Sequence, residues 1–523
     1  MKFRVVGSLL AALVMVVWLG TPSQAGTKLK LVPIGTFDSG SGEGGAEISK
    51  YDGWTRQIFV TNGAKDRIDV VDARDPKNMS LVRTIDLTEF GPSITSVDVI
   101  KNLGVATVIG SPATQPGSVV FFSPTTGKVL HSRQVGPLPD MVTFAGYGSA
   151  VLVANEGEPR CITPSGEATT DPTEAVNPRG SVSVIRLVDG VPSQPIDIDF
   201  TSLDGSTAAL QADGVRVPIW PGALPSQDLE PEFITVDGRY AYVTLQEANS
   251  VAIVDWVSAT LVGVKGLGLK TWDNSWIGFD ASDRDDGYQT AIWPVSNMYM
   301  PDGIAAMRVN GRSYLVTANE GDGVEYFAGP VADDEEQELC FTDEARVKDL
   351  TLDPGFFTSD ISDDAQMGRL KVTTAYPSAS GPNGFTSLAA YGGRSFTIWD
   401  TRGNVVFDSG SGLEAIIHAS VDDAWSSDHD GRSDDKGPEP EGVEVGSPYG
   451  IPTIFVGLER SGGVMVFDAS NPSSPDFVEW VRTDDVSPEG LQYVPAFASP
   501  TRKPLLIVSH EISGTTTVFE IRR

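Results

Sequence analysis

The sequence is poor in the residues that most metal and redox enzymes use, with only 2 cysteines and 4 histidines among 523 residues. The histidines are dispersed, so the chain offers neither a thiolate cluster nor a histidine cluster for a soft metal. Basic residues are also scarce, at 38 against 70 acidic ones, which gives a formal net charge of −32. Such a chain as a whole repels nucleic acid and anionic lipid, and we expect no nucleic-acid partner.

Long apolar runs are missing after the N-terminus, and no later stretch approaches the roughly 20 residues of a spanning helix. Residues 1–25 predict a secretory signal peptide: Lys2 and Arg4 precede an apolar run, and Ser23 and Ala25 form a small-residue cleavage site. An uncleaved N-terminal anchor is the alternative. The last residues read as a strand rather than a C-terminal anchor. We therefore expect a mature chain of residues 26–523, free in the periplasm or the medium.

Glycine and proline are abundant, at 55 and 35 residues, and many of them fall at the turns and strand starts of a repeat. In each copy an acidic residue, usually after proline, opens a short apolar strand, and a turn leads to a second strand that ends in another acid. Glu47 opens a weaker copy, and a degenerate copy follows over residues 96–122. The five clear copies open and close with Asp140 and Glu156, Glu232 and Glu247, Asp302 and Glu320, Glu441 and Glu459, and Glu489 and Glu511.

Repeated units of three or four short strands predict an all-β fold, a single β-propeller over residues 26–523 with long loop insertions on one face. We count seven blades. Residues 385–410 could form an eighth, but they lack an opening acid and are interpreted as completing the fifth. Residues 28–36 are expected to close the ring against the C-terminal strands. Unrelated β-sandwich domains with similar hairpins are the alternative.

The opening and closing acids should lie on one face of the disc, because the two ends of a hairpin meet at the same end. If the first strand is innermost, the carboxylates crowd around the axis and require cations. Oxygen ligands favour Ca²⁺, then Mg²⁺ or Mn²⁺, with Fe as a further option. Strand capping by these acids is the alternative. The candidate metal ligands are Glu47, Asp140, Glu156, Glu230, Glu232, Glu247, Asp302, Glu320, Asp322, Glu439, Glu441, Glu459, Glu489 and Glu511.

Four other residues near this face are candidates for catalysis: Arg160, Arg432, Arg460 and His510. The arginines follow acids and could clamp a phosphate, although ion pairing with the carboxylates is the alternative. The acidic loops at 282–287 and 428–435 could bind calcium at the rim, contribute to the axial site, or simply be solvated. The sequence contains no nucleophile elbow, P-loop or dinucleotide fingerprint.

Several long motifs resemble the choice-of-anchor I family. They include Asp-Leu-Glu-Pro-Glu at 228–232, Thr-Ala-Asn-Glu-Gly-Asp at 317–322, Gly-Pro-Glu-Pro-Glu-Gly at 437–442 and Gly-Leu-Glu-Arg-Ser-Gly-Gly-Val at 457–464. The resemblance covers roughly residues 30–521 and implies a YVTN-like propeller. Members are often labelled alkaline phosphatase-like. The family is named for varied C-terminal surface anchors, and the lack of one here implies release rather than display.

Two function classes remain open. In the first, axial metal ions activate water against a small-molecule phosphoester, as in propeller phytases and phosphatases. In the second, the metal stiffens a non-catalytic disc that binds an extracellular polymer or an envelope partner. In both cases we expect a monomer.

The two cysteines, Cys161 and Cys340, lie in the insertions 157–180 and 321–368, which leave their blades just past Glu156 and Glu320. Because an even pair in an exported protein is usually oxidised, we predict a disulfide that ties these segments together across the funnel. Two free buried thiols are the alternative.

Overall fold

A computed structural model describes residues 29–523 except for 273–277, 331–336, 358–359 and 421–429. The predicted signal peptide lies outside the described residues. No helix among the described residues has the length and apolarity needed to cross a membrane.

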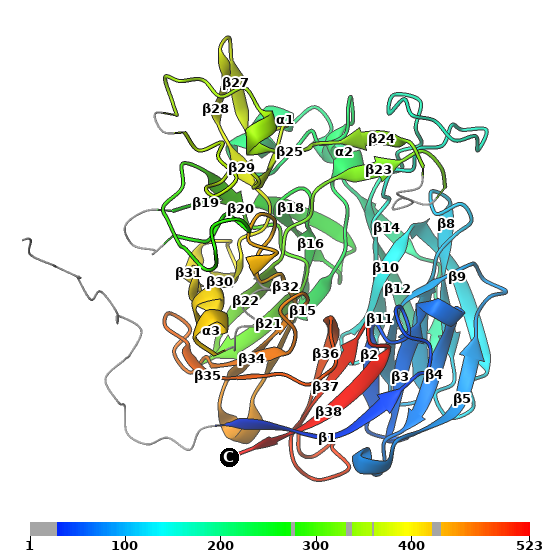
Figure 1. The fold of residues 1–523 in the computed structure, drawn as a ribbon. Coiled ribbons are helices and arrows are strands. Elements are labelled where there is room, and N and C mark those ends of the chain that lie inside the picture. Colours follow the sequence, from blue (N-terminus) through cyan, green and yellow to red (C-terminus); the bar gives the residue numbers. More distant parts are fainter. Residues whose placement is uncertain (1–28, 273–277, 331–336, 358–359, 421–429) are drawn as a thin grey trace, which may run out of the picture.

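Seven four-stranded antiparallel units stand around a common axis in the described part of the chain (Figure 1), which confirms the predicted propeller. Successive blades contact each other through their inner strands, and blade 7 returns to blade 1. Blades 1 and 2 consist of β2 (Ser49–Asp52), β3 (Gln57–Asn62), β4 (Arg67–Asp72) and β5 (Ser80–Asp86), and of β6 (Ile94–Ile100), β7 (Leu103–Val108), β8 (Pro116–Phe122) and β9 (Val129–Pro137). Blade 3 consists of β10 (Pro139–Ala145), β11 (Ala150–Asn155), β12 (Ser181–Val188) and β14 (Ile196–Asp199), with the short β13 (Val191–Pro192) beside them. Blade 4 consists of β15 (Ile234–Asp237), β16 (Tyr240–Leu245), β17 (Ser250–Asp255) and β18 (Thr260–Gly266).

The last three blades follow the same order, and the first strand of the chain completes the seventh. Their strands are β21 (Ile304–Val309), β22 (Arg312–Asn319), β30 (Ser395–Asp400) and β31 (Val405–Asp408); β32 (Pro440–Gly446), β33 (Thr453–Leu458), β34 (Val464–Asp468) and β35 (Asp476–Val481); and β36 (Pro488–Val494), β37 (Leu505–His510), β38 (Thr515–Arg522) and β1 (Lys30–Asp38). β1 pairs antiparallel with β38, so the ring closes as predicted.

The second strand of each blade is largely buried because neighbouring blades cover both of its faces. β11 and β33, for example, are buried at every residue. Aromatic side chains fill the wedges between blades, as where Phe59 of blade 1 packs 5.8 Å from Phe122 of blade 2. A fully buried strand flanked by half-buried ones explains why the sequence alternates between apolar runs and polar turns.

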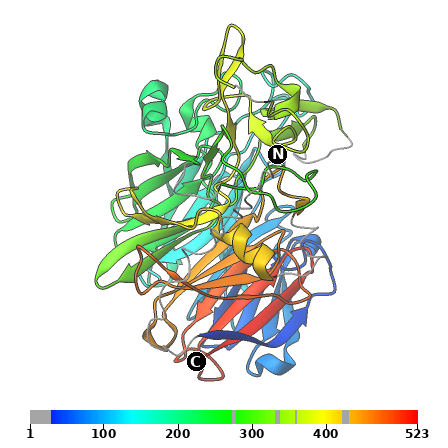
Figure 2. The ribbon, with the colours of Figure 1, turned by 60° about the vertical axis from the view of Figure 1, so that its left-hand side comes forward.

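A large insertion stands at one end of the disc (green to yellow in Figures 1 and 2). Most of it separates β22 from β30, and it joins residues that follow β18. The segment 385–410 was predicted to complete the fifth blade. Its first residues belong to the insertion instead, in the strand β28 (Gly384–Ser387), and only β30 and β31 complete the blade. The insertion contains the sheet β19 (Leu269–Thr271), β20 (Ser296–Met298), β29 (Ala389–Ala390), β26 (Lys371–Thr373) and β25 (Glu344–Arg346), and the hairpins β23 (Glu325–Phe327) with β24 (Leu339–Thr342) and β27 (Ala379–Gly381) with β28 (Gly384–Ser387).

Helices are short and peripheral: α1 (Thr207–Ala212), α2 (Pro225–Asp228) and α3 (Gly412–Ser420). The structure contains the predicted disulfide between Cys161 and Cys340, whose Cα atoms lie 6.4 Å apart. A buried ion pair between Arg216 and Asp343 joins the same two regions. The insertion therefore reaches back over blade 4 to blade 3, as the pairing of the cysteines requires.

Candidate metal centre at the propeller axis

The opening acids are positioned by a backbone device that recurs in four blades. The residue two places before the acid adopts a left-handed conformation, and proline follows it. These residues are Leu138 (φ 44°), Met300 (φ 46°), Glu439 (φ 50°) and Ser487 (φ 60°). In blades 3, 6 and 7 the ladder also shifts register at the acid. Left-handed non-glycine residues are uncommon and bulges re-aim side chains, so this strained start directs each acid toward the axis.

A glycine after the acid lets the next blade approach closely. A Cβ on Gly303 would lie 2.7 Å from the carbonyl oxygen of Glu441, one on Gly442 would lie 2.4 Å from that of Glu489, and one on Gly490 would lie 2.5 Å from that of Glu47. The glycine of the Pro-acid-Gly motif therefore allows the backbones at the opening acids of blades 5, 6, 7 and 1 to lie directly against one another.

The closing acids are held beside the opening ones by backbone hydrogen bonds. The amide of Glu156 donates to the carbonyl of Leu138, that of Glu459 to Glu439 and that of Glu511 to Ser487, each at 2.9 Å. Both ends of each hairpin thus deliver a carboxylate to the same face, as the repeat predicts.

The charges of different blades act on one another across the axis. Asp140 of blade 3 contributes to the raised pKa of Glu47, Glu232, Asp302 and Glu489, which belong to blades 1, 4, 5 and 7. In each case burial is the larger cause. Asp302 in turn contributes to the raised pKa of Glu441 in blade 6. The structure therefore brings the opening acids of six blades into one electrostatic group; blade 2, the degenerate copy, supplies none.

Burial is the main cause of the raised pKa values of these carboxyl groups. It raises the pKa of Glu47 to about 8, of Glu247 to about 7 and of Asp140 to about 6. The pKa values of Glu156 and Glu441 are also raised well above the ordinary range, first by burial and then by neighbouring carboxylates. Carboxylates that are buried side by side take up protons unless a cation balances their charge. A bound cation would therefore stabilise the ionised form of this group.

Four ring carboxylates each have one buried oxygen without a hydrogen-bond donor in the described part of the chain: Glu232, Glu247, Glu441 and Glu489. None of the four forms an ion pair within 4.0 Å there. Ionised carboxylates only accept hydrogen bonds, and buried acceptors are rarely left unsatisfied. These oxygens therefore fit a hard divalent cation, and the residues present suit Ca²⁺ better than a metal that needs nitrogen or sulfur ligands.

One sector of the ring carries its own cations. Glu320, Glu439 and Glu459 place ligand oxygens within 4.8 Å of one another. Lys436 lies among them, with Nζ 2.8 Å from Glu320 and 3.8 Å from Glu439. Burial opposes the charge of Lys436, yet Glu320, Asp322 and Glu439 hold its pKa well above the usual value. In this sector, side-chain cations of the protein offset part of the carboxylate charge.

The candidate arginines are engaged in ion pairs. Arg432 contacts Glu439 through Nε at 2.6 Å and Nη2 at 3.0 Å. Arg460 lies 3.1 Å from Glu459, and Arg160 pairs with Glu158. The geometry thus matches the ion-pairing alternative for the three arginines.

The remaining candidates occupy different surroundings. His510 is 1% exposed within blade 7, where burial lowers its pKa to about 4 and Thr515 contacts its ring. Asp322 lies at the outer side, with its side chain half exposed. Glu230 is buried, and burial followed by Glu247 raises its pKa.

The insertion covers part of the ring. Tyr326 of β23 is buried, and burial, then Glu158 and Glu230, raise the pKa of its hydroxyl. The same hairpin carries Cys340 of the disulfide. The acids of blades 3 and 4 therefore lie beneath this hairpin.

A second acidic group forms at the rim, where Asp280, Asp285 and Asp430 place oxygens within 4.8 Å of one another. It joins the two acidic loops singled out in the sequence, although residues 428 and 429 lie outside the described residues. Asp283 and Asp434 of these loops instead pair with Arg369. Burial, then Asp285, raises the pKa of Asp280 to about 7.

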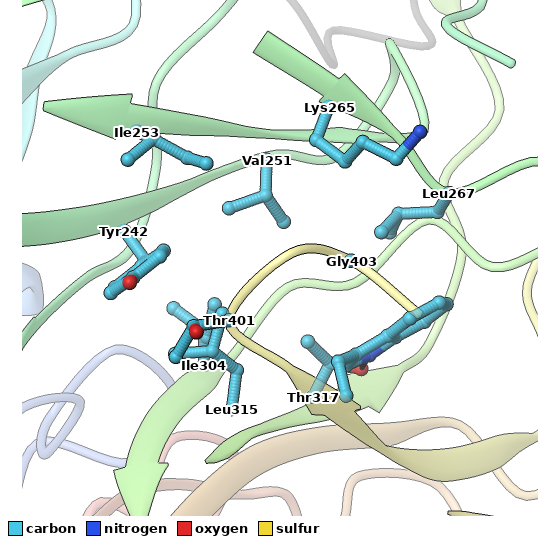
Figure 3. Close-up of a pocket in the computed structure, with 11 residues that line it drawn as sticks. Tyr242, Val251, Ile253, Lys265, Leu267, Ile304, Leu315, Thr317, Thr401 and Gly403 are labelled. Atoms are coloured by element: carbon cyan, nitrogen blue, oxygen red, sulfur yellow. Dashed lines mark hydrogen bonds between the residues drawn. The ribbon is translucent and has the colours of Figure 1, made fainter. Parts of the chain in front are cut away.

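An apolar crevice between blades 4 and 5 is separate from the ring (Figure 3). Tyr242, Val251 and Leu315 line it and Lys265 lies at its edge, around a cavity of about 20 Å³. That volume is about the room of one water molecule.

Sequence reasoning missed Lys436, Glu158 and Asp280. A lone lysine within an acidic loop, directly before a Pro-acid motif, is the signal that could have found Lys436. The fold and the ring together define the class: a seven-bladed β-propeller with an acidic axis.

The chain belongs to the choice-of-anchor I domain family, which it matches over residues 47–472. Gigasin-3a of Magallana gigas is 28% identical over 192 residues, covering 31% of this chain and 67% of that protein. The Mesenchyme-specific cell surface glycoprotein of Strongylocentrotus purpuratus is 26% identical over 337 residues, covering 57% of this chain and 41% of that protein. The chain thus spans less than half the length of the second relative. The family and the internal disulfide fit an extracellular protein.

Among solved structures, Kuenenia stuttgartiensis hydrazine synthase aligns over 91% of this chain and 96% of that chain, at 12% identity and a TM-score of 0.47. The Pan2 WD40 domain of Neurospora crassa aligns over 94% and 95%, at 11% identity and a TM-score of 0.46.

Proposed function

We propose that this protein is an exported cation-binding propeller whose axial carboxylates hold a divalent ion of the calcium type, and that its role is non-catalytic binding in the extracellular space. The observation that carries the proposal is the set of four buried carboxylate oxygens without donors, on Glu232, Glu247, Glu441 and Glu489. They belong to blades 4, 6 and 7, so one ion would tie distant parts of the ring together.

Hydrolysis of a phosphoester is the second candidate. The observation in its favour is the cluster of Lys436, Arg432 and Arg460 at the edge of the carboxylates. A bound metal would supply the Lewis acid, and these cations would hold the phosphate. Against this role, all three already bind carboxylates, and releasing one would leave Glu439 or Glu320 without its partner.

The experiment begins with the mature chain after exhaustive chelation, titrated with Ca²⁺, Mg²⁺ and Mn²⁺ by calorimetry and thermal unfolding. We expect Ca²⁺ to stabilise the protein by about 2.7 kcal/mol at a free concentration of 100 times Kd. The double variant Glu441→Gln/Glu489→Gln should lose this effect. The double variant Glu89→Gln/Glu167→Gln, at two exposed acids that belong to neither carboxylate group, is the matched control and should keep it. Elemental analysis without metal, together with an unmoved melting curve, would refute the proposal.

A phosphoester panel at alkaline pH, with and without chelator, separates the two functions. Glu320→Gln removes one charge at nearly constant shape. Turnover that depends on Ca²⁺ and vanishes in Glu320→Gln, while the fold survives, would establish the hydrolase instead.

A further inference from the structure

The face opposite the carboxylate ring has a different chemistry from the rest of the molecule. It includes the turns that join the first and second strands of the blades, at residues 53–56, 101–102, 146–149, 238–239, 310–311, 447–452 and 495–504. In a chain with 70 acidic and 38 basic residues, these seven turns contain no aspartate or glutamate. They contain five basic residues: Arg56, Lys101, Arg239, Arg502 and Lys503.

Several aspartates that border this face are engaged, whereas Asp75, Asp189 and Asp476, in or beside the turns between third and fourth strands, are exposed and form no ion pair among the described residues. Asp237 pairs with Arg308 at 2.8 Å, Asp255 with Arg239 and Asp400 with Arg402. Asp52 is buried and accepts hydrogen bonds from its own turn. By contrast, Arg56, Lys101, Arg502 and Lys503 are exposed and form no ion pair among the described residues. The seven turns between first and second strands therefore carry a net positive charge, against the strongly negative whole.

The same turns present exposed aromatic rings. Tyr147 is 96% exposed, Phe497 93% and Trp54 78%. The turns of Trp54 and Phe497 touch, because a Cβ on Gly53 would lie 3.3 Å from the carbonyl oxygen of Ala498. The turn of Lys101 touches that of Tyr147, since a Cβ on Gly148 would lie 3.4 Å from Ile100. Rings and cations thus gather in two groups, on blades 7 and 1 and on the next two blades, 2 and 3, and we call these two groups the patch.

Turn conformation does not explain these residues. Arg56, Lys101, Tyr147 and Arg502 have φ values of 56°, 52°, 58° and 58°. Glycine and asparagine occupy this left-handed region at lower cost. Large side chains at these positions cost conformational energy and gain nothing from packing, because they project into solvent.

We propose that this patch docks the protein on an anionic lipid membrane. The tips of separate turns lie on one side of a disc, which suits a flat partner. Aromatic side chains favour the membrane–water interface, and lysine and arginine are attracted to anionic headgroups. Phe497 has no polar atom to interact with water or sugar hydroxyls, so it gains most from entering the interface. The propeller would then lie on the membrane with its carboxylate ring facing away from it.

The test is sedimentation of the mature protein at low salt with vesicles of phosphatidylcholine alone and of phosphatidylcholine with one third phosphatidylglycerol. We expect binding only to the anionic vesicles. Lys101→Glu/Arg502→Glu/Lys503→Glu should weaken it by roughly 100-fold, and Trp54→Ser/Tyr147→Ser/Phe497→Ser should abolish it. Phe356→Ser, which removes an exposed ring from the insertion at the other end, is the control and should bind normally. Melting curves verify that each variant is folded.

No sedimentation with anionic vesicles would overturn the assignment, as would equal binding of both triple variants and the native protein. Retention on an immobilised acidic polysaccharide without any binding to vesicles would overturn it in favour of a glycan partner. Failure of any kind here leaves the cation ring untouched, since the two surfaces share no residue.

Discussion

The ammonium group of Lys436 lies 2.8 Å from Glu320, in a sector of the axial ring where three glutamate oxygens come within 4.8 Å of one another. In this sector a protein cation offsets the charge of the carboxylates, which is the role that we propose for a metal ion elsewhere in the ring. Lys436 precedes the opening motif of blade 6, while Glu320 closes blade 5, so the pair also links two blades.

Replacing Lys436 by methionine should destabilise the metal-free protein by about 3–5 kcal/mol, because it leaves the carboxylate of Glu320 without its cation, while Glu439 keeps Arg432. Added Ca²⁺ should restore much of the loss by occupying the vacated sector. Chemical denaturation with chelator and with Ca²⁺ measures both effects. The exposed Lys503→Met is the control. A variant as stable as the native protein would show that this pair contributes nothing.

Stability of the metal-free protein should fall as pH rises from about 4 to about 8. Glu47, Glu247 and Asp140 have folded pKa values of about 8, 7 and 6, above their ordinary values. The folded chain therefore binds more protons than the unfolded chain in this window, and each deprotonation there costs folding free energy. Ca²⁺ should flatten the slope and bind more tightly at the upper end. Melting temperatures across the window with chelator would contradict this if they rose with pH.

Gly442→Ala should cost about 1–3 kcal/mol, because its Cβ would lie 2.4 Å from the carbonyl oxygen of Glu489 in the next blade. Relief of the clash must push blades 6 and 7 apart at the axis, so Ca²⁺ affinity should drop as well. Calorimetry and denaturant titration measure the two losses. Gly263→Ala, where a Cβ meets nothing within 4 Å, should change neither quantity.

Loss of the disulfide in Cys161→Ser/Cys340→Ser should lower stability by about 5 kcal/mol in the chain-entropy model, since the bond spans a sequence separation of 179. The hairpin that carries Tyr326 would also be freed from blade 3, so a chelator should strip Ca²⁺ from the ring faster. Stopped-flow release of Ca²⁺ into a fluorescent chelator tests this. An unchanged release rate would mean that the hairpin does not limit access.

The blades could be predicted from the sequence because their signals are local. Each hairpin is marked by an acid, an apolar run, a turn and a second run, so the amino-acid order alone pairs Asp140 with Glu156 and Glu489 with Glu511. The insertion between β22 and β30 could not be predicted, because it repeats nothing and its sheet joins strands that lie far apart in the chain. The partners of Lys436 were hidden for a related reason: Glu320 and Glu439 come from two different blades, which only the closed ring brings together.

The pairing of β1 with β38 also sets how the molecule responds to force. Lys30 stands opposite Arg522, and the pairing runs on to Asp38 opposite Thr515. Tension applied between Lys30 and Arg522 would load this antiparallel ladder at one end, so its hydrogen bonds would break one after another instead of sharing the load. The ring would open at this seam at low force, while a pull across the face of the disc would meet all seven blades at once.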